Sequence, residues 1–87
     1  MEKLLVQAVS KTIRQLRVMK KLSQEELGSR SGLDRTYISG VERGIRNISL
    51  RSLESIVNGI DVPVTAFLDR VRQNCASEDS EGREHEH

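Results

Sequence analysis

The feature that most constrains this chain is a helix of about two turns with a clear start and a clear stop. Ser23 and Glu26 have the S-x-x-E spacing of a capping box, in which each side chain accepts a hydrogen bond from the other residue's backbone N–H. Gly32 is a favourable stop, because glycine readily adopts the left-handed conformation with which many helices end. A helix this short is not stable alone in water. It must pack against neighbouring elements.

Helical periodicity predicts four more helices. In the first, apolar residues recur on one face at spacings of four, four and three: Leu5, Val9, Ile13 and Leu16. Asp34 can cap a third helix that runs to Gly44, and Ser49 can cap a fourth that ends at Gly59. Pro63 suits the first turn of a fifth helix, where its missing N–H costs nothing. The predicted fold class is therefore all-α, with five helices in one compact domain.

The predicted core is small and aliphatic, since 36% of the 87 residues are apolar and only 2% are aromatic. The fourth helix supplies an apolar face made of Leu50, Leu53, Ile56, Val57 and Ile60. The fifth supplies an apolar stripe made of Val64, Phe67, Leu68 and Val71. A core this small leaves little surplus stability, and we therefore expect the protein to form oligomers. We interpret this stripe, with Val62 beside it, as both core and homodimer face, anchored by Phe67.

Charge is segregated along the chain. Residues 1–76 carry a balance of +5, and residues 77–87 carry a balance of −4. A basic body with an acidic tail is a hint of nucleic-acid binding. The tail has no large apolar residue to bury. We therefore predict a folded domain over residues 1–76 and a disordered acidic tail over residues 77–87.

Composition also argues against several classes of protein. A single cysteine, Cys75, cannot form a disulfide within the chain and fits a reducing cytoplasm. We find neither a signal-peptide pattern nor an apolar run of about 18 residues, so we expect a cytoplasmic protein without a membrane span. Both histidines, His85 and His87, lie in the tail, which offers no preformed metal geometry. We expect no metal, no cofactor, no small-molecule ligand and no enzymatic activity.

A helix-turn-helix is predicted where the second and third helices meet. Gly28 lies where the neighbouring helix must come close, and Gly32 redirects the chain through a tight turn. Leu27, Ile38 and Val41 then hold the two helices together. The third helix is thereby presented outward, in the geometry that places a recognition helix in a DNA major groove.

These residues also carry a resemblance. The segment SQEELGSRSGLDRTYISGVERG, within residues 13–68, resembles the helix-turn-helix (XRE) family of the phage Cro and lambda-type repressors. Matching positions are Gln24, Leu27, Gly32, Ile38, Ser39, Glu42, Arg43 and Gly44. More narrowly, LDRTYISGVERGIRNISLRSLESIVNGI resembles the controller proteins of bacterial restriction–modification systems. That resemblance implies a short dimeric regulator of its own promoter without a ligand-binding domain.

Residues on the exposed face of the third helix and in the loop after it are the candidates for DNA contact. Arg35 offers the planar fork of donors that matches the O6/N7 pair of guanine, although it could instead pair with Asp34 or Glu25. Gly40 is expected to allow close approach to the groove floor. Candidate base contacts are Arg35, Thr36, Ser39 and Arg46. Candidate phosphate contacts are Gln24, at a helix N-terminus, and Tyr37, Arg43, Asn47 and Ser52.

Glu42 stands apart from these residues, because an acid near the end of the recognition helix opposes both the helix dipole and the DNA. The resemblance implies that Glu42 pairs with Arg17 in a structural role. We therefore predict a homodimer that binds double-stranded DNA at a pseudo-palindromic operator, with a pair of dimers on adjacent sites as an option. A DNA-binding antitoxin or a phage-type repressor remains an alternative. A protein-binding module would leave Arg35, Thr36 and Arg46 unexplained.

Overall fold

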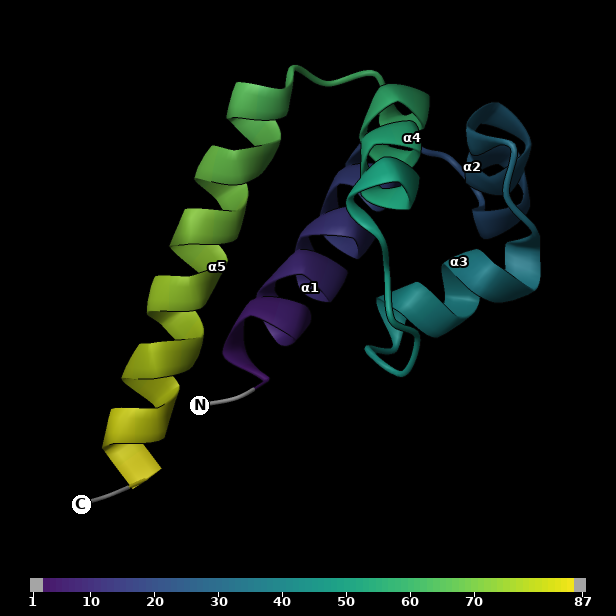
Figure 1. Cartoon of the computed structure of the whole chain (residues 1–87). Helices are drawn as coiled ribbons and strands as arrows, with labels where there is room; N and C mark the ends of the chain where they lie inside the picture. The colour runs from purple at the N-terminus through teal and green to yellow at the C-terminus, as the bar shows by residue number, and fades with distance from the viewer. Residues whose placement is uncertain (1–2, 86–87) are drawn as a thin grey trace.

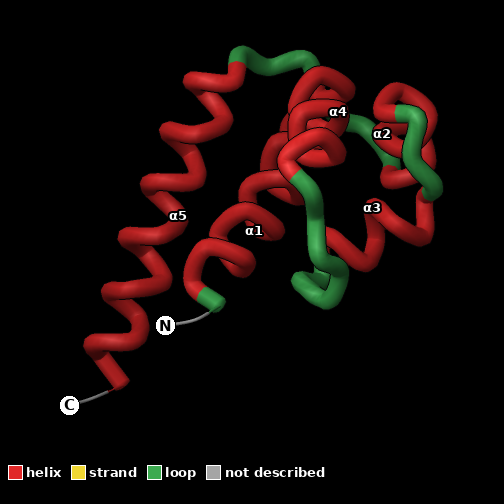
Figure 2. Tube along the Cα trace, viewed as in Figure 1, coloured by secondary structure: helices red, strands yellow, loops and turns green. Residues whose placement is uncertain are grey.

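The computed structural model describes the backbone of residues 3–85 and the side chains of residues 3–77. Its described residues form five α-helices and no strand, which confirms the predicted all-α class (Figures 1 and 2). The helices are α1 (Leu4–Met19), α2 (Gln24–Ser31), α3 (Arg35–Glu42), α4 (Leu50–Ile60) and α5 (Val64–His85). Helix α5 packs along α1, and α2 packs on both α3 and α4.

The short second helix begins and ends as its sequence predicts. The hydroxyl of Ser23 accepts a hydrogen bond from the Glu26 backbone N–H at 2.9 Å, and the Glu26 carboxylate accepts one from the Ser23 N–H at 2.9 Å. Hydrogen bonding to Ser23, first from its backbone N–H and then from its side chain, lowers the pKa of the Glu26 carboxyl, so its charge is kept at the positive end of the helix dipole. Gly32 ends α2 in the left-handed conformation, with φ 68°.

Other helix boundaries differ from the predicted ones. Asp34 precedes α3, but its side chain forms no capping hydrogen bond, and α3 ends at Glu42 rather than Gly44. Ser49 caps α4 by accepting from the Ser52 N–H at 3.0 Å, as predicted.

The predicted end of α4 at Gly59 is wrong, because the helix continues to Ile60 and Asp61 adopts the left-handed conformation. Gly59 has a packing role instead, since a Cβ there would lie 2.5 Å from the Ser31 Oγ of α2. Pro63 likewise lies just outside the helix it was expected to join. Its carbonyl accepts the hydrogen bond from the Phe67 N–H that begins α5.

All five helices contribute side chains to one core. Its buried apolar side chains are Ala8, Ile13, Leu16, Leu27, Ile38, Val41, Ile56, Val57, Ile60, Phe67 and Val71. Two residues expected to face inward do not, since the side chains of Leu5 and Leu50 are 62% and 85% exposed. Each lies in the first turn of its helix, ahead of the point where that helix is covered by its neighbours.

Helix α5 is fixed on α1 by a group of neutral polar side chains that the sequence analysis missed. Asn74 follows Phe67 and Val71 on the inward face and is only 6% exposed. Its amide donates to the Thr12 hydroxyl at 2.8 Å and to the Gln15 side-chain oxygen at 3.0 Å. The Thr12 hydroxyl donates in turn to a backbone carbonyl of α1 at 2.7 Å. We call Thr12, Gln15 and Asn74 the amide network.

Beyond the amide network the backbone of α5 continues as a helix through His85, where the sequence analysis predicted disorder from residue 77. A helix that is already anchored extends without the unfavourable step of nucleation, and glutamate is a good helix former. A domain boundary at residue 76 remains a prediction.

Candidate nucleic-acid interface

The helix-turn-helix unit is formed by α2, the turn at residues 32–34 and α3. Gly28 lies in α2 where this turn passes, and a Cβ at Gly28 would lie 2.6 Å from the backbone oxygen of Leu33. Backbone cannot move aside as a side chain can, so only glycine fits this contact. Gly32 and Gly28 thus act together, one bending the chain and the other allowing the bent chain to lie against α2.

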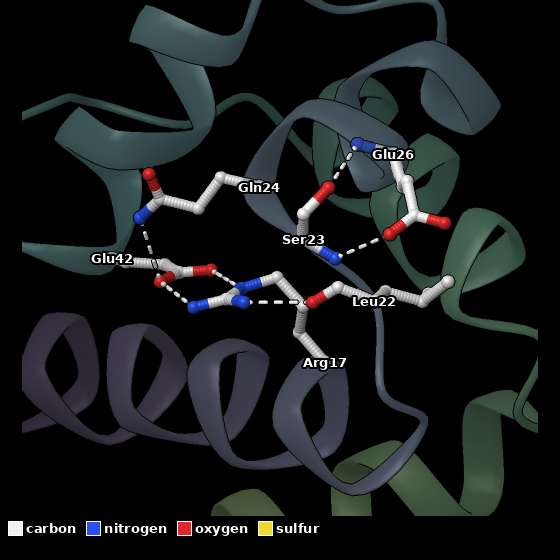
Figure 3. A network of polar contacts seen from close by, with 6 residues as sticks. All are labelled: Arg17, Leu22, Ser23, Gln24, Glu26 and Glu42. Atoms are coloured by element: carbon white, nitrogen blue, oxygen red, sulfur yellow. Dashed lines mark hydrogen bonds and ion pairs between the residues drawn. The ribbon is translucent and has the colours of Figure 1, made fainter.

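A network of charged and polar groups holds the two helices on α1 (Figure 3). The Arg17 guanidinium donates to both carboxylate oxygens of Glu42, with Nε–Oε2 at 2.6 Å and Nη2–Oε1 at 3.1 Å. Its Nη1 donates to the Leu22 carbonyl at 2.8 Å, and the Gln24 amide donates to Glu42 Oε1 at 3.1 Å. We call Arg17, Leu22, Gln24 and Glu42 the charged network.

This network is largely shielded from water, because the side chains of Arg17 and Glu42 are 13% and 4% exposed. A bidentate Arg–carboxylate pair fixes both partners in one plane. It therefore neutralises the acid at the end of α3 and sets the angle of α3 against α1. The amide of Gln24 is engaged in the network, so the groups at this position that can meet a phosphate are the unpaired backbone N–H groups of the α2 N-terminus.

The residues that begin α3 are free to contact a ligand. Arg35 and Thr36 are exposed. Within the described part of the chain, neither Asp34 nor Glu25 forms an ion pair or hydrogen bond with the Arg35 guanidinium. The alternative in which Arg35 is satisfied by a neighbouring acid therefore has no support in the structure. Ser39 is half-buried on the same helix.

Arg46 reaches back over the recognition helix from the loop that follows it. Its guanidinium carbon lies 5.3 Å from the centre of the Tyr37 ring, a cation–π distance. Its stem crosses Gly40, where an added Cβ would lie 2.6 Å from the Arg46 Cγ. The space at Gly40 is thus filled by Arg46, which corrects the expectation that it is left open for the groove floor. The Tyr37 hydroxyl donates a long hydrogen bond to the Asn47 carbonyl at 3.4 Å.

The remaining predicted phosphate contacts lie in the loop after α3 and in the first turn of α4. Arg43 and Asn47 are exposed in the loop between α3 and α4. Ser52 is half-buried in the first turn of α4, where its hydroxyl accepts a hydrogen bond from Ser49 at 3.1 Å. The loop therefore adds an arginine and an amide to the surface begun by Arg35.

The apolar stripe of α5 is divided between two directions. Phe67 and Val71 are 1% and 7% exposed and belong to the core of the single chain. Val64 and Leu68 point outward and are 49% and 56% exposed, and Val62 is half-buried. Phe67 was expected to anchor a dimer, but in the single chain its ring is buried in the core and offers almost no surface to a partner.

The described residues contain no group of three or more side chains suited to a metal ion. Among the helices of that same part of the chain, none is both long and apolar enough to cross a membrane. The side chains of His85 and His87 lie outside the described residues.

This chain belongs to the helix-turn-helix family, whose sequence profile matches residues 13–67. It is 45% identical over 58 residues to the control protein C.BamHI of Bacillus amyloliquefaciens, a match that covers 66% of this chain and 72% of that protein. Its fold superposes on the crystal structure of the restriction–modification controller protein C.Esp1396I with a TM-score of 0.79 and 41% identity, over 80% of this chain and 92% of that one. Superposition on the tetramer of C.Esp1396I in complex with its natural 35-base-pair operator gives a TM-score of 0.81 at 40% identity. That match covers 83% of this chain and 95% of the C.Esp1396I chain.

Proposed function

We propose that this protein is a restriction–modification controller that binds operator DNA as a homodimer and regulates its own promoter. The observation that carries the proposal is the exposed, unpaired Arg35 guanidinium at the start of a recognition helix whose angle is fixed by the charged network. Similarity to control proteins over most of the chain supports it. The protein is a DNA-binding regulator rather than an enzyme, and it acts where bacterial DNA lies, in the cytoplasm.

Base readout is assigned to the exposed face of α3 and to the arginine laid across it. The proposed base contacts are Arg35, Thr36, Ser39 and Arg46. The proposed phosphate contacts are the α2 N-terminus at Gln24, then Tyr37, Arg43, Asn47 and Ser52. Phosphate contacts orient the domain on the duplex, and base contacts select the sequence.

Two recognition helices related by a two-fold axis read half-sites about one helical turn, or roughly 34 Å, apart. A pseudo-palindromic operator follows from that symmetry. The structure of C.Esp1396I as a tetramer on its 35-base-pair operator supports a further step, in which two dimers of this protein occupy adjacent sites.

The test is the substitution Arg35→Ala on an operator recovered by selection from random duplex DNA. Loss of one good base contact costs about 1–3 kcal/mol, which lowers operator affinity roughly 5- to 150-fold while random DNA is bound almost as before. The control is Arg72→Ala, because Arg72 is an exposed arginine on α5 whose one partner among the described side chains is Asp69, and its loss removes the same charge. Equal losses on operator and random DNA would show that Arg35 does not contact a base.

A further inference from the structure

The turn that ends the recognition helix α3 carries an exposed apolar side chain that the DNA contacts proposed above do not use. Gly44 adopts the left-handed conformation, with φ 72°, and its N–H donates to the Val41 carbonyl at 3.0 Å. The N–H of the next residue, Ile45, donates to the Gly40 carbonyl at 3.1 Å. These two hydrogen bonds define a Schellman motif, which fixes the backbone of Ile45 relative to α3.

The Ile45 side chain lacks the contact that commonly accompanies this motif. An apolar residue at its position often packs on a side chain in the last turns of the same helix. Here the residues that would receive it are Ser39, which is polar, and Gly40, which has no side chain. Ile45 is therefore 70% exposed, and among the large apolar side chains that the structure describes only Leu50 is more exposed.

Basic and polar side chains flank Ile45 in the loop after α3. Arg43, Arg46 and Asn47 are all exposed there, and the Arg46 guanidinium is held over α3 at 5.3 Å from the Tyr37 ring. A protein partner with an apolar surface would have to desolvate two arginines to cover Ile45, which is costly. A DNA strand would instead offer phosphates to both arginines, and between successive phosphates it presents a deoxyribose whose C–H groups are apolar.

We propose that Ile45 is a further DNA contact, which packs on the apolar C–H surface of the duplex at the edge of the groove that α3 enters. The proposal rests on the DNA-binding function proposed above and adds an apolar contact to its charged and polar ones. Two groups of DNA offer this chemistry, the deoxyribose and the C5-methyl group of thymine. Because the Schellman motif already fixes the backbone, binding orders only the Ile45 side chain, and little conformational entropy is lost.

An apolar contact and a phosphate contact respond differently to salt. Each phosphate that a protein neutralises releases counterions, so it adds a slope of about −0.9 to a plot of the logarithm of the binding constant against the logarithm of the salt concentration. Burial of an isoleucine releases no counterion. Loss of the Ile45 side chain should therefore lower the whole plot without changing its slope, whereas loss of an arginine that contacts phosphate should make the slope shallower.

The experiment compares three variants of the full chain on a duplex that carries one operator half-site. Ile45→Ala keeps the backbone N–H of the motif and removes only exposed carbon, so the domain should melt as wild type does while half-site binding weakens about five- to tenfold at every salt concentration. Arg43→Ala should also bind more weakly, with a slope lower in magnitude by about one. The matched control is Leu68→Ala, which should bind as wild type does, because Leu68 is 56% exposed on α5, on the other side of α1 from α3 (Figure 1).

Replacement of single thymines by deoxyuridine distinguishes the two sources of the contact, since it removes only the methyl group. If one replacement weakens wild-type binding as much as Ile45→Ala does, and does not weaken the variant further, Ile45 contacts that thymine. If no replacement has this effect while Ile45→Ala still binds more weakly, Ile45 contacts a deoxyribose. Either result supports the proposal.

Half-site binding by Ile45→Ala that equals that of wild type overturns the proposal, even if binding to the full operator is weaker, because Ile45 would then act between subunits. A slope that changes as much as that of Arg43→Ala overturns it as well, since the loss would be that of a phosphate contact. Selective loss of operator affinity in Arg35→Ala, with no effect of Ile45→Ala, would leave the proposed function standing and remove only this contact. A wild type without operator preference would contradict the proposed function, while binding of Ile45→Ala to random duplex would still report on a deoxyribose contact.

Discussion

The charged network and the amide network both join helices through buried polar groups, but they act on different parts of the helices. The charged network links three helix ends, namely the last turn of α1, the first turn of α2 and the last turn of α3. The amide network links the middle of α1 to the middle of α5. Helix ends carry unpaired backbone groups, and one of these, the Leu22 carbonyl after α1, is satisfied by Arg17.

This difference in position suggests that the two networks have different structural roles. Charged groups at helix ends set how the recognition helix is presented, while neutral amides in helix bodies set how α5 is seated on α1. Charges cost more to desolvate than amides, so each network should respond differently when one partner is removed. Glu42→Ala should therefore destabilise the domain more than Asn74→Ala does, and removal of residues 77–87 should change its stability least.

The largest effect is expected for Glu42→Ala. It leaves the Arg17 guanidinium, 13% exposed, without its carboxylate, and removing one partner of a buried ion pair costs about 3–5 kcal/mol. Urea unfolding followed by circular dichroism measures the loss, with Glu54→Ala, an exposed acid of α4, as the matched control. An unchanged unfolding midpoint would show that the pair contributes nothing in solution.

The double variant Arg17→Met/Glu42→Leu sharpens the same prediction. Replacing both partners of a buried pair by apolar residues of similar size removes the stranded charge, so most of the lost stability should return. If the charged network positions α3, operator affinity should stay low although the fold is restored. Full recovery of both stability and operator affinity would show that the charged network only stabilises the fold. The proposed difference between the charged network and the amide network would then be wrong.

A smaller effect is expected for Asn74→Ala in the amide network. The Thr12 hydroxyl keeps its bond to the Ala8 carbonyl, and the Gln15 side chain is only half-buried and can turn to water. Losing a neutral hydrogen-bonded group costs about 1–3 kcal/mol. Hydrogen exchange should show faster opening of α5, while operator half-site affinity stays near wild type. Gln73→Ala, the exposed neighbour, is the control, and a loss as large as that of Glu42→Ala would contradict the ranking.

Local signals explain what could be predicted from the sequence. The capping box at Ser23, the left-handed stop at Gly32 and the cap at Ser49 depend on residues within a few positions, so spacing alone identifies them. The Arg17–Glu42 pair spans 25 positions and was expected only because the family resemblance implied it. Nothing in the local pattern would have paired these two residues.

Contacts between distant segments explain what was missed. Asn74 donates a hydrogen bond to Thr12, which lies 62 positions away in the sequence. In the sequence, an amide at the end of an apolar stripe suggests that the helix face becomes exposed there, so this contact was not predicted. From the sequence, Gly40 was expected to leave space for DNA, but the Arg46 side chain lies against it. Gly59 was expected to end a helix, but it makes room for the Ser31 side chain of α2. Leu50 was expected to be buried because helical periodicity places it on the apolar face of α4. Periodicity does not show where neighbouring helices stop covering that face, and Leu50 is exposed.

The smallest effect is expected from ending the chain after Ala76. This truncation keeps the amide network, including Asn74, and removes residues 77–87 with their charge of −4. The sequence supplies no large apolar side chain in that segment, so stability should change by less than about 0.5 kcal/mol. Operator affinity should be equal or slightly higher, because an acidic segment repels phosphate, and the gain should shrink as salt screens the repulsion. The control is the 87-residue chain with amides in place of the tail acids, which separates the effect of charge from that of length. Its operator affinity should match that of the truncated chain.

A lower melting temperature or weaker operator binding after truncation would contradict this prediction. It would mean that the last turns of α5 stabilise the domain or its dimer, and that the packing of α5 on α1 extends beyond the amide network.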